Sequence, residues 1–381
     1  MIIIEGESMT TSMVKVEYSN SKKRIIKLDI ARTFAILCVI LCHSSEALYQ
    51  INKSGWNALS NQSRIFMILS HTIGRLGVPI FLFLSGALLL KKNIDSDEDV
   101  FKFYKYNLLP LFIVNEIWVV IYNIFFYVTN QRNNVTLEFL IKELLCLKQV
   151  PVPNMWYFPM ILGMYLGIPF VAKIVKTFSF KSLSILLSGT FIVSFALPAI
   201  NILLKIFGVA NKWNSLLDIS FFGGAYGLYI VLGYFIANNK LINLTNLHIW
   251  IITIISFGLT LFMQLISYSD VSRYTFNVWY DNPFLLICTA GIFILFNRID
   301  DLKINKTFSK FFTFMSKISL SLFFLHYIIQ YLLKPYIIKI NIKIPIKMLI
   351  LYLSVIVICT LISLLLSKIK FIAKHAMLIK N

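Results

Sequence analysis

The feature that most constrains this chain is its succession of long apolar stretches. A run of about 17–24 mostly apolar residues is long enough to cross a ~30 Å hydrocarbon core as a helix. Uninterrupted apolar runs indicate helices, because a backbone in lipid must satisfy its own hydrogen bonds. We therefore predict an all-α polytopic membrane protein with about ten transmembrane helices in one bundle. The predicted spans are residues 28–49, 72–91, 106–129, 155–175, 182–204, 219–238, 247–267, 281–297, 312–333 and 346–367.

Composition agrees with a membrane location. Hydrophobic residues make up 58% of the chain and charged residues only 14%, whereas a soluble domain carries about 25% charged residues. The net charge of +19 would suggest nucleic acid in a soluble protein. Here most lysines lie in short loops between apolar runs, so we exclude nucleic-acid binding. The five cysteines are scattered without metal-ligand spacing and are read as buried hydrophobes, with no metal site.

Lys and Arg also set the predicted orientation. With the N-terminus inside, the cytoplasmic segments hold more of these residues than the outer loops, so both termini are predicted to be cytoplasmic. The last outer loop is nevertheless unusually basic, with Lys334, Lys339, Lys343 and Lys347.

The predicted organisation is a single membrane domain with short polar ends. Residues 1–24 form a polar cytoplasmic segment, residues 25–368 the membrane domain and residues 369–381 a basic cytoplasmic tail. One segment, 136–147, mixes apolar and charged residues at helical spacing but is too short to span. We expect it to lie along the membrane surface.

The first span carries four ionisable residues on one face. In "LDIARTFAILCVILCHSSEAL", at 100° per residue, Asp29, Arg32, His43 and Glu46 share one helical stripe, and Arg32 and His43 are about 16 Å apart along the axis. Ionisable groups in lipid are costly, so this stripe is predicted to face the bundle interior and to mark a site. Asp29 is expected to pair with Arg32 or to face the headgroups.

Depth along the spans separates the polar residues into layers. His43, Glu46, Arg75 and His326 are predicted to share a layer near the outer boundary. The inner layer holds Arg32 and Ser85, and Glu116 is placed near the midplane between the two layers. The remaining histidines lie at or beyond span ends and are expected to be solvated or interfacial; they are His71, His248 and His375.

These residue types suit more than one activity. A neutral histidine can take a proton from a hydroxyl or accept an acyl group itself, and Glu46 can orient the His43 ring. Arginines can neutralise a phosphate or stabilise an oxyanion. Proton-coupled transporters also use His, Glu and Arg inside membranes, so a glycan flippase or proton-coupled transporter is the alternative. A third possibility is a catalytically silent scaffold for a polysaccharide synthase.

Five motifs, in order along the chain, resemble those of the acyltransferase-3 family. The stretch "LDIARTFAILCVILCH" (28–43) is similar to the family's first span, in which an Arg, ten residues and a His follow one another. The others are "RLGVPIFLFLSGALLL" (75–90), "MWYFPMILGMYLGIPFV" (155–171), "YIVLGYFIAN" (229–238) and "SLFFLHYIIQ" (321–330).

The resemblance implies an integral enzyme of a bacterial plasma membrane that moves an acyl group, usually acetyl, onto a hydroxyl of a cell-surface glycan. Acetyl-CoA is the implied donor and enters from the cytoplasm; no permanently bound cofactor is expected. The resemblance also implies that His43 handles the acyl group and that Arg32 is its partner nearer the donor. The chain is most like the polysaccharide O-acetyltransferase branch, which includes enzymes acting on enterobacterial common antigen.

Two departures from the family pattern affect the expected binding residues. Where relatives often carry closely spaced arginines before span 3, this chain has Lys102 and Lys105, and Met155 stands where some relatives have His. Lysine offers a point charge rather than a bidentate fork. The predicted site residues are His43, Arg32, Glu46 and Glu116 for catalysis, Arg75, Trp156, Tyr157 and His326 for acceptor binding, and Lys102, Lys105 and Ser85 for donor binding.

Overall fold

The fold is taken from a computed structural model that describes residues 24–49, 53–132, 136–209, 212–220, 223–239, 244–269 and 279–379. Every regular element in these ranges is a helix, which confirms the all-α prediction. The predicted polar segment 1–24 lies outside the described residues except for its last residue, Arg24.

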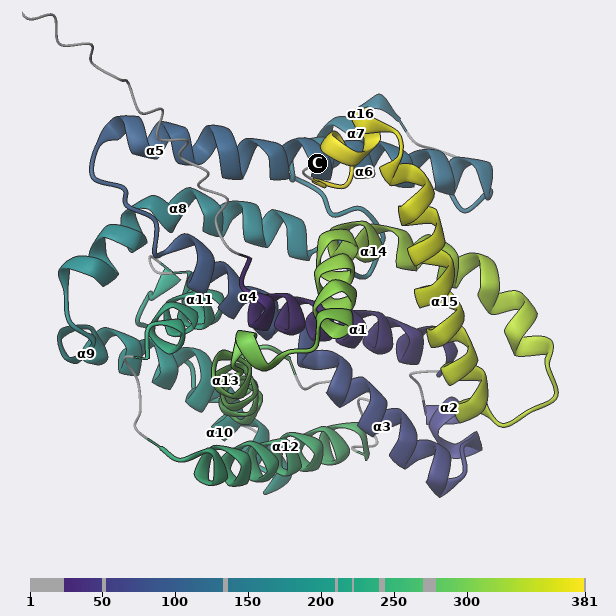
Figure 1. Cartoon of the computed structure of the whole chain (residues 1–381). Helices are drawn as coiled ribbons and strands as arrows, with labels where there is room; N and C mark the ends of the chain where they lie inside the picture. The colour runs from purple at the N-terminus through teal and green to yellow at the C-terminus, as the bar shows by residue number, and fades with distance from the viewer. Residues whose placement is uncertain are drawn as a thin grey trace, which may run out of the picture.

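Figure 1 shows how the helices are arranged. In chain order they are α1 (Ile26–Leu48), α2 (Lys53–Ala58), α3 (Asn61–Arg75), α4 (Gly77–Leu89), α5 (Asp97–Phe103), η1 (Tyr104–Leu108), α6 (Leu109–Val128), α7 (Leu137–Leu144), α8 (Tyr157–Thr177), α9 (Phe180–Phe191), η2 (Ile192–Ala196), α10 (Leu197–Ile206), α11 (Gly224–Ala237), α12 (Asn246–Ser269), α13 (Pro283–Asn297), η4 (Asp301–Lys303), α14 (Lys306–Lys339), α15 (Ile344–Ser367) and α16 (Lys370–His375).

Among the described residues, seven continuous helices are long and apolar enough to cross a membrane. They are Asn61–Leu89, Asp97–Val128, Tyr157–Thr177, Phe180–Leu204, Asn246–Ile266, Lys306–Lys339 and Ile344–Ser367. Helices α11 and α13 are apolar but shorter. Each of the ten predicted spans overlaps a helix. The number of ten crossings and the cytoplasmic location of both termini stay predictions.

Helix α1 lies in the middle of the bundle, with α6 on one side and α12 on the opposite side in Figure 1. It packs against α3, α4, α13, α14 and α15. Glycines in α3 and α4 let both helices approach α1 closely, as small residues commonly do between helices in membranes. A Cβ at Gly74 would lie 2.5 Å from Cys42 Cβ, and one at Gly77 would lie 2.5 Å from the Ala35 carbonyl oxygen.

Helices α1 and α14 run parallel, with polar contacts in register along their shared face. Arg32 Nη1 donates to Ser316 Oγ at 3.1 Å, about three turns before Gln330 Nε2 donates to Ser44 Oγ at 2.9 Å. The stripe of α1 therefore faces protein rather than lipid, as the sequence predicts. The ion-pair partner of Asp29 differs from the expected one. Arg24 Nε, and not Arg32, pairs with Asp29 Oδ2, at 2.5 Å.

The predicted surface segment 136–147 contains α7. Thr136 caps it by accepting from Phe139 N. Buried Glu143 anchors the helix to the bundle, because it accepts from Arg132 Nη1 at 2.8 Å and from Asn123 Nδ2 at 2.8 Å. The location of α7 along a membrane surface stays a prediction.

Two glycines bring α4 and α11 into backbone contact. A Cβ at Gly86 would lie 1.8 Å from the Ile230 carbonyl oxygen, and one at Gly233 would lie 2.3 Å from the Phe83 carbonyl oxygen. The two positions are reciprocal, since each glycine faces the backbone of the other helix. This contact fixes α4, which carries residues of the site described below.

We expect Gly86→Ala to lower the stability of the protein by about 1–3 kcal/mol or more, because the added methyl group forces α4 and α11 apart. The measurement is the thermal unfolding midpoint in detergent. Gly163→Ala in α8 is the matched control, since no atom lies within 4 Å of its added Cβ. An unfolding midpoint for Gly86→Ala equal to that of the control would contradict the close contact.

Candidate functional site

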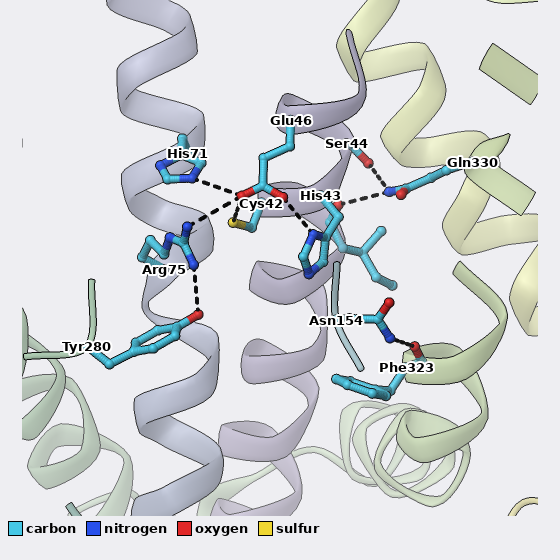
Figure 2. A network of polar contacts seen from close by, with 11 residues as sticks. Cys42, His43, Ser44, Glu46, His71, Arg75, Asn154, Tyr280, Phe323 and Gln330 are labelled. Atoms are coloured by element: carbon cyan, nitrogen blue, oxygen red, sulfur yellow. Dashed lines mark hydrogen bonds and ion pairs between the residues drawn. The ribbon is translucent and has the colours of Figure 1, made fainter. Parts of the chain in front are cut away.

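The carboxylate of Glu46 is the centre of a polar network near the C-terminal end of α1 (Figure 2). Its Oε2 accepts from His43 Nδ1 at 2.8 Å. Its Oε1 lies 3.3 Å from His71 Nε2, 3.4 Å from Arg75 Nη2 and 3.7 Å from the Cys42 thiol. One side chain thus links the stripe of α1 to two residues of α3.

Helical spacing explains why these groups meet. His43 and Glu46 are three residues apart on α1, and His71 and Arg75 are four residues apart on α3, so each pair lies on one helix face. Gly74 lets the α3 face approach α1 closely enough for both pairs to reach the same carboxylate. His71 is fully buried and Arg75 is buried, so their polar atoms need protein partners.

The contact with Glu46 selects the tautomer of the neutral His43 ring. A carboxylate only accepts hydrogen bonds, so Nδ1 of His43 carries the proton and neutral imidazole has a lone pair on Nε2. In the described part of the chain no hydrogen bond engages Nε2 of His43. The ring stacks on that of His326 with centroids 5.2 Å apart. His326 is itself fixed, because its Nδ1 donates to the Leu322 carbonyl oxygen at 3.1 Å.

Aromatic rings surround the other side of Arg75. Its guanidinium carbon lies 4.5 Å from the Trp279 ring centroid and 5.4 Å from that of Tyr280. Arg75 Nη1 also donates to the Tyr280 hydroxyl at 3.2 Å. Trp156 stacks on Tyr280 with centroids 5.5 Å apart. Arg75 therefore connects the Glu46 carboxylate to an aromatic wall.

This wall bounds a cavity of about 180 Å³, which we call the histidine cavity. Two of the lining residues carry a buried atom without a hydrogen-bond partner among the described residues, Asn154 Oδ1 and Arg75 Nε. The cavity lining comprises Val39, Cys42, His43, Glu46, Gly74, Arg75, Val78, Pro153, Asn154, Trp156, Tyr157, Trp279, Tyr280 and Phe323. The mixture of ionisable groups and exposed ring faces is suited to a polar, ring-shaped ligand.

A second cavity, the arginine cavity, lies beside Arg32 and has a volume of about 300 Å³. Its walls are mainly apolar, with Arg32, Ser85, Tyr165 and Ser319 as the polar exceptions. The remaining lining residues are Phe81, Leu84, Leu88, Leu89, Leu111, Tyr157, Phe158, Ile161, Leu320 and Phe323. Tyr157 and Phe323 line both cavities, so these two side chains form the partition between them.

The ligand atoms of Cys42, Glu46 and His71 all lie within 4.8 Å of one another, a spacing that could hold a metal ion. The same carboxylate oxygen, Oε1 of Glu46, is also 3.4 Å from Arg75 Nη2. A guanidinium is a permanent cation. We therefore assign the positive charge at this position to Arg75.

Most of the residues predicted from the sequence meet at the two cavities. Five surround or contact the histidine cavity with Glu46, namely His43, Arg75, Trp156, Tyr157 and His326. Arg32 and Ser85, which were predicted to share one layer, both line the arginine cavity; that this layer is the inner one stays a prediction.

Three predicted residues lie elsewhere. Glu116 lines neither cavity, and its carboxylate accepts from Asn115 Nδ2 at 2.9 Å on another face of α6. Lys102 is exposed and pairs with Glu98 at 2.7 Å, and Lys105 lies over the Tyr106 ring, outside both cavities. Glu116 is only partly buried, and depth along a span does not specify which side of a helix faces the site.

Two features of the candidate site were not predicted from the sequence. The expectation that His71 is solvated or interfacial is wrong, because α3 and α4 form one long helix that places His71 inside the bundle beside Glu46. Trp279 and Tyr280 were not singled out at all. The sequence does contain a pattern that could have identified them. The dipeptide Trp-Tyr occurs at 156–157 and again at 279–280, each time just before or at the start of an apolar helix.

Comparison with known families decides the assignment. The family model described as an acyltransferase domain, acyltransferase-3, matches residues 25–368. The chain belongs to the acyltransferase-3 family. It is thus a multi-pass membrane acyltransferase, and the match covers α1 to α15, including both cavities. No curated protein and no solved structure matches the chain significantly.

The Glu46–Arg75 contact can be tested with a double-mutant cycle. Glu46→Gln and Arg75→Met should each lower the free energy of unfolding, because each leaves a mostly buried polar partner uncompensated. The double variant should be less destabilised than the sum of the single variants, by about 0.5–3 kcal/mol. Unfolding in detergent with denaturant measures all four proteins. Additive effects would show that the two side chains do not interact.

Proposed function

We propose that this acyltransferase is an O-acetyltransferase of a bacterial plasma membrane. It transfers acetyl from acetyl-CoA to a hydroxyl of a cell-surface or lipid-linked polysaccharide. The observation that carries the proposal is the Glu46–His43 contact of 2.8 Å in a cavity separated from Arg32 by only two side chains. An oriented imidazole base on one side and an arginine on the other suit a hydroxyl acceptor and an anionic thioester donor.

The donor is assigned to the arginine cavity. CoA carries phosphates and a long, mostly apolar arm that ends in the thioester. The apolar walls of this cavity suit the arm, and Arg32, held by Ser316, supplies a cation inside it. The acetyl group then reaches His43 by passing between Tyr157 and Phe323. A movement of these two side chains would open that path without a change in the helices.

The acceptor is assigned to the histidine cavity. Rings of Trp156, Trp279 and Tyr280 line it, and aromatic faces stack well on the apolar faces of sugars. Nε2 of His43 takes the proton of the acceptor hydroxyl, whose oxygen attacks the thioester carbonyl. Glu46 stabilises the imidazolium that forms. The tetrahedral oxyanion collapses, the C–S bond breaks, and the CoA thiolate takes the proton back from His43.

In the alternative mechanism, the reaction passes through a covalent acetyl-histidine. Nε2 of His43 then attacks the thioester first, and the acceptor hydroxyl attacks the acetyl-imidazole in a second step. Both routes need the Nδ1–H tautomer that Glu46 imposes, and both give the same products, an acetyl ester and CoA thiol.

His43→Ala should abolish acetyl transfer, because no other described residue lining the histidine cavity offers a neutral imidazole. The measurement is the transfer of label from radiolabelled acetyl-CoA to cell-envelope glycans by purified protein. His248→Ala, on an exposed histidine outside the cavities, should retain activity. Active His43→Ala protein would overturn the assignment, and a folded wild type that transports glycans without labelling them would favour the transporter alternative.

Arg32→Ala should lower kcat/KM for acetyl-CoA by about 10²–10³-fold, the range seen when one hydrogen-bond donor that stabilises the transition state is removed. Ser316→Ala should give a smaller loss, because it removes the hydrogen bond that positions Arg32 but keeps the charge. Arg64→Ala is the matched control, since Arg64 lies near Trp56 and away from both cavities. Equal kcat/KM for Arg32→Ala and Arg64→Ala would remove Arg32 from the donor site.

A further inference from the structure

A third cavity, of about 160 Å³, lies beside the C-terminal half of α14, and we call it the α14 cavity. Its volume is well above the ~10–15 Å³ that one water molecule needs. Four lining residues come from α14 at positions i, i+3, i+4 and i+7, so they form one helix face. The lining comprises Tyr327, Gln330, Tyr331 and Lys334 from α14, and His43, Glu46, Ala47 and Pro153 from elsewhere.

The α14 cavity shares three residues with the histidine cavity. His43, Glu46 and Pro153 line both, so the imidazole of His43 is bordered by two separate cavities. Their remaining walls differ in chemistry. The histidine cavity offers aromatic ring faces and the already paired Arg75, whereas the α14 cavity offers two tyrosine hydroxyls and a lysine.

The α14 cavity carries a positive charge without a counterion. In the described part of the chain, Lys334 makes no ion pair, and its side chain is half-buried. Glu46, the one acidic residue in the lining, is already engaged by His43 and Arg75. The charge is not offset nearby in the sequence, because residues 327–350 contain four lysines and neither Asp nor Glu.

The hydroxyls beside Lys334 are also free to bind a ligand. No hydrogen bond engages the hydroxyl of Tyr327 or Tyr331 among the described residues. Their rings are fixed by edge contacts, Tyr327 with Tyr122 at 6.3 Å and Tyr331 with Phe125 at 5.4 Å between centroids. The amide of Gln330 is already engaged, because it donates to Ser44 Oγ and holds α14 against α1.

We propose that the α14 cavity is a second acceptor subsite that binds an anionic group, a carboxylate or a phosphate, carried by the glycan. Lys334 supplies the charge, and Tyr327 and Tyr331 donate hydrogen bonds to the anion. The acceptor then extends across His43, with its reacting sugar in the histidine cavity and its anionic group in the α14 cavity. This inference rests on the proposed function, because it names the class of acceptor.

The test is binding of three probes to the purified full-length protein, measured by calorimetry without acetyl-CoA. The probes are a uronic-acid oligosaccharide, its carboxyl-reduced neutral counterpart, and a polyprenyl-diphosphate-linked sugar. We expect at least one anionic probe to bind about tenfold more tightly than the neutral one. Tighter binding of the uronic acid identifies a carboxylate on the glycan, and tighter binding of the lipid-linked sugar identifies its phosphate only where Lys334→Gln removes the difference.

Substitutions of Lys334 test whether the anionic group of the probe binds in the α14 cavity. Lys334→Gln should remove the tenfold preference, and Lys334→Arg should keep most of it. Lys343→Gln is the matched control, because Lys343 is an exposed lysine of the same basic segment that does not line the cavity. An equal loss in Lys343→Gln would mean general surface attraction and would overturn the proposal, as would equal binding of all three probes by the wild type.

The transfer assay separates this inference from the proposed function. If the wild type transfers acetyl groups, Lys334→Gln should raise KM for the anionic acceptor and leave kcat and the KM of the neutral acceptor unchanged. Binding that depends on Lys334 without any acetyl transfer would overturn the proposed function while keeping the subsite. Acetyl transfer without a preference for anionic acceptors would overturn the subsite alone.

Discussion

The site depends on one carboxylate placed between one guanidinium and two imidazoles inside a mainly apolar bundle. Glu46 accepts from His43 on its own helix and from His71 and Arg75 on α3, and through Arg75 it is linked to Tyr280 ahead of α13. A charge in such surroundings is stable only when it is paired and hydrogen-bonded. The network therefore fixes the relative positions of three segments that are far apart in the sequence and, at the same time, the tautomer of His43.

The sequence was sufficient for the features that follow from helical geometry and from the cost of charge in lipid. The stripe of α1 could be predicted because 100° per residue places Arg32, His43 and Glu46 on one face, and lipid excludes that face. The matching depths of Arg75 and His326 placed them correctly near His43. Helix type and approximate spans followed from continuous apolar runs, and family motifs agreed with the same residues.

Other features depend on tertiary contacts that periodicity does not reveal. The long helix formed by α3 and α4 includes polar residues before the apolar run, so hydropathy alone placed His71 outside the bundle. Glu116 and the lysines before span 3 were selected by depth or charge, but Glu116 lines neither of the two cavities and its carboxylate accepts from the neighbouring Asn115. Trp279 and Tyr280 lie just before α13, and hydropathy and charge did not mark them as part of the site, although they repeat the Trp-Tyr dipeptide of residues 156–157. The three cavities likewise arise from the packing of helices distant in the sequence.

The central claim is that Glu46 holds His43 with a proton on Nδ1 and a free lone pair on Nε2. Nitrogen-15 NMR of histidine-labelled protein under mildly alkaline conditions tests it most directly, with the His43 signals assigned by subtracting the spectrum of a His43→Gln variant. The account predicts a protonated Nδ1 and an unprotonated Nε2 in the wild type, and loss of this preference in Glu46→Gln. A wild-type His43 that carries its proton on Nε2 would contradict it.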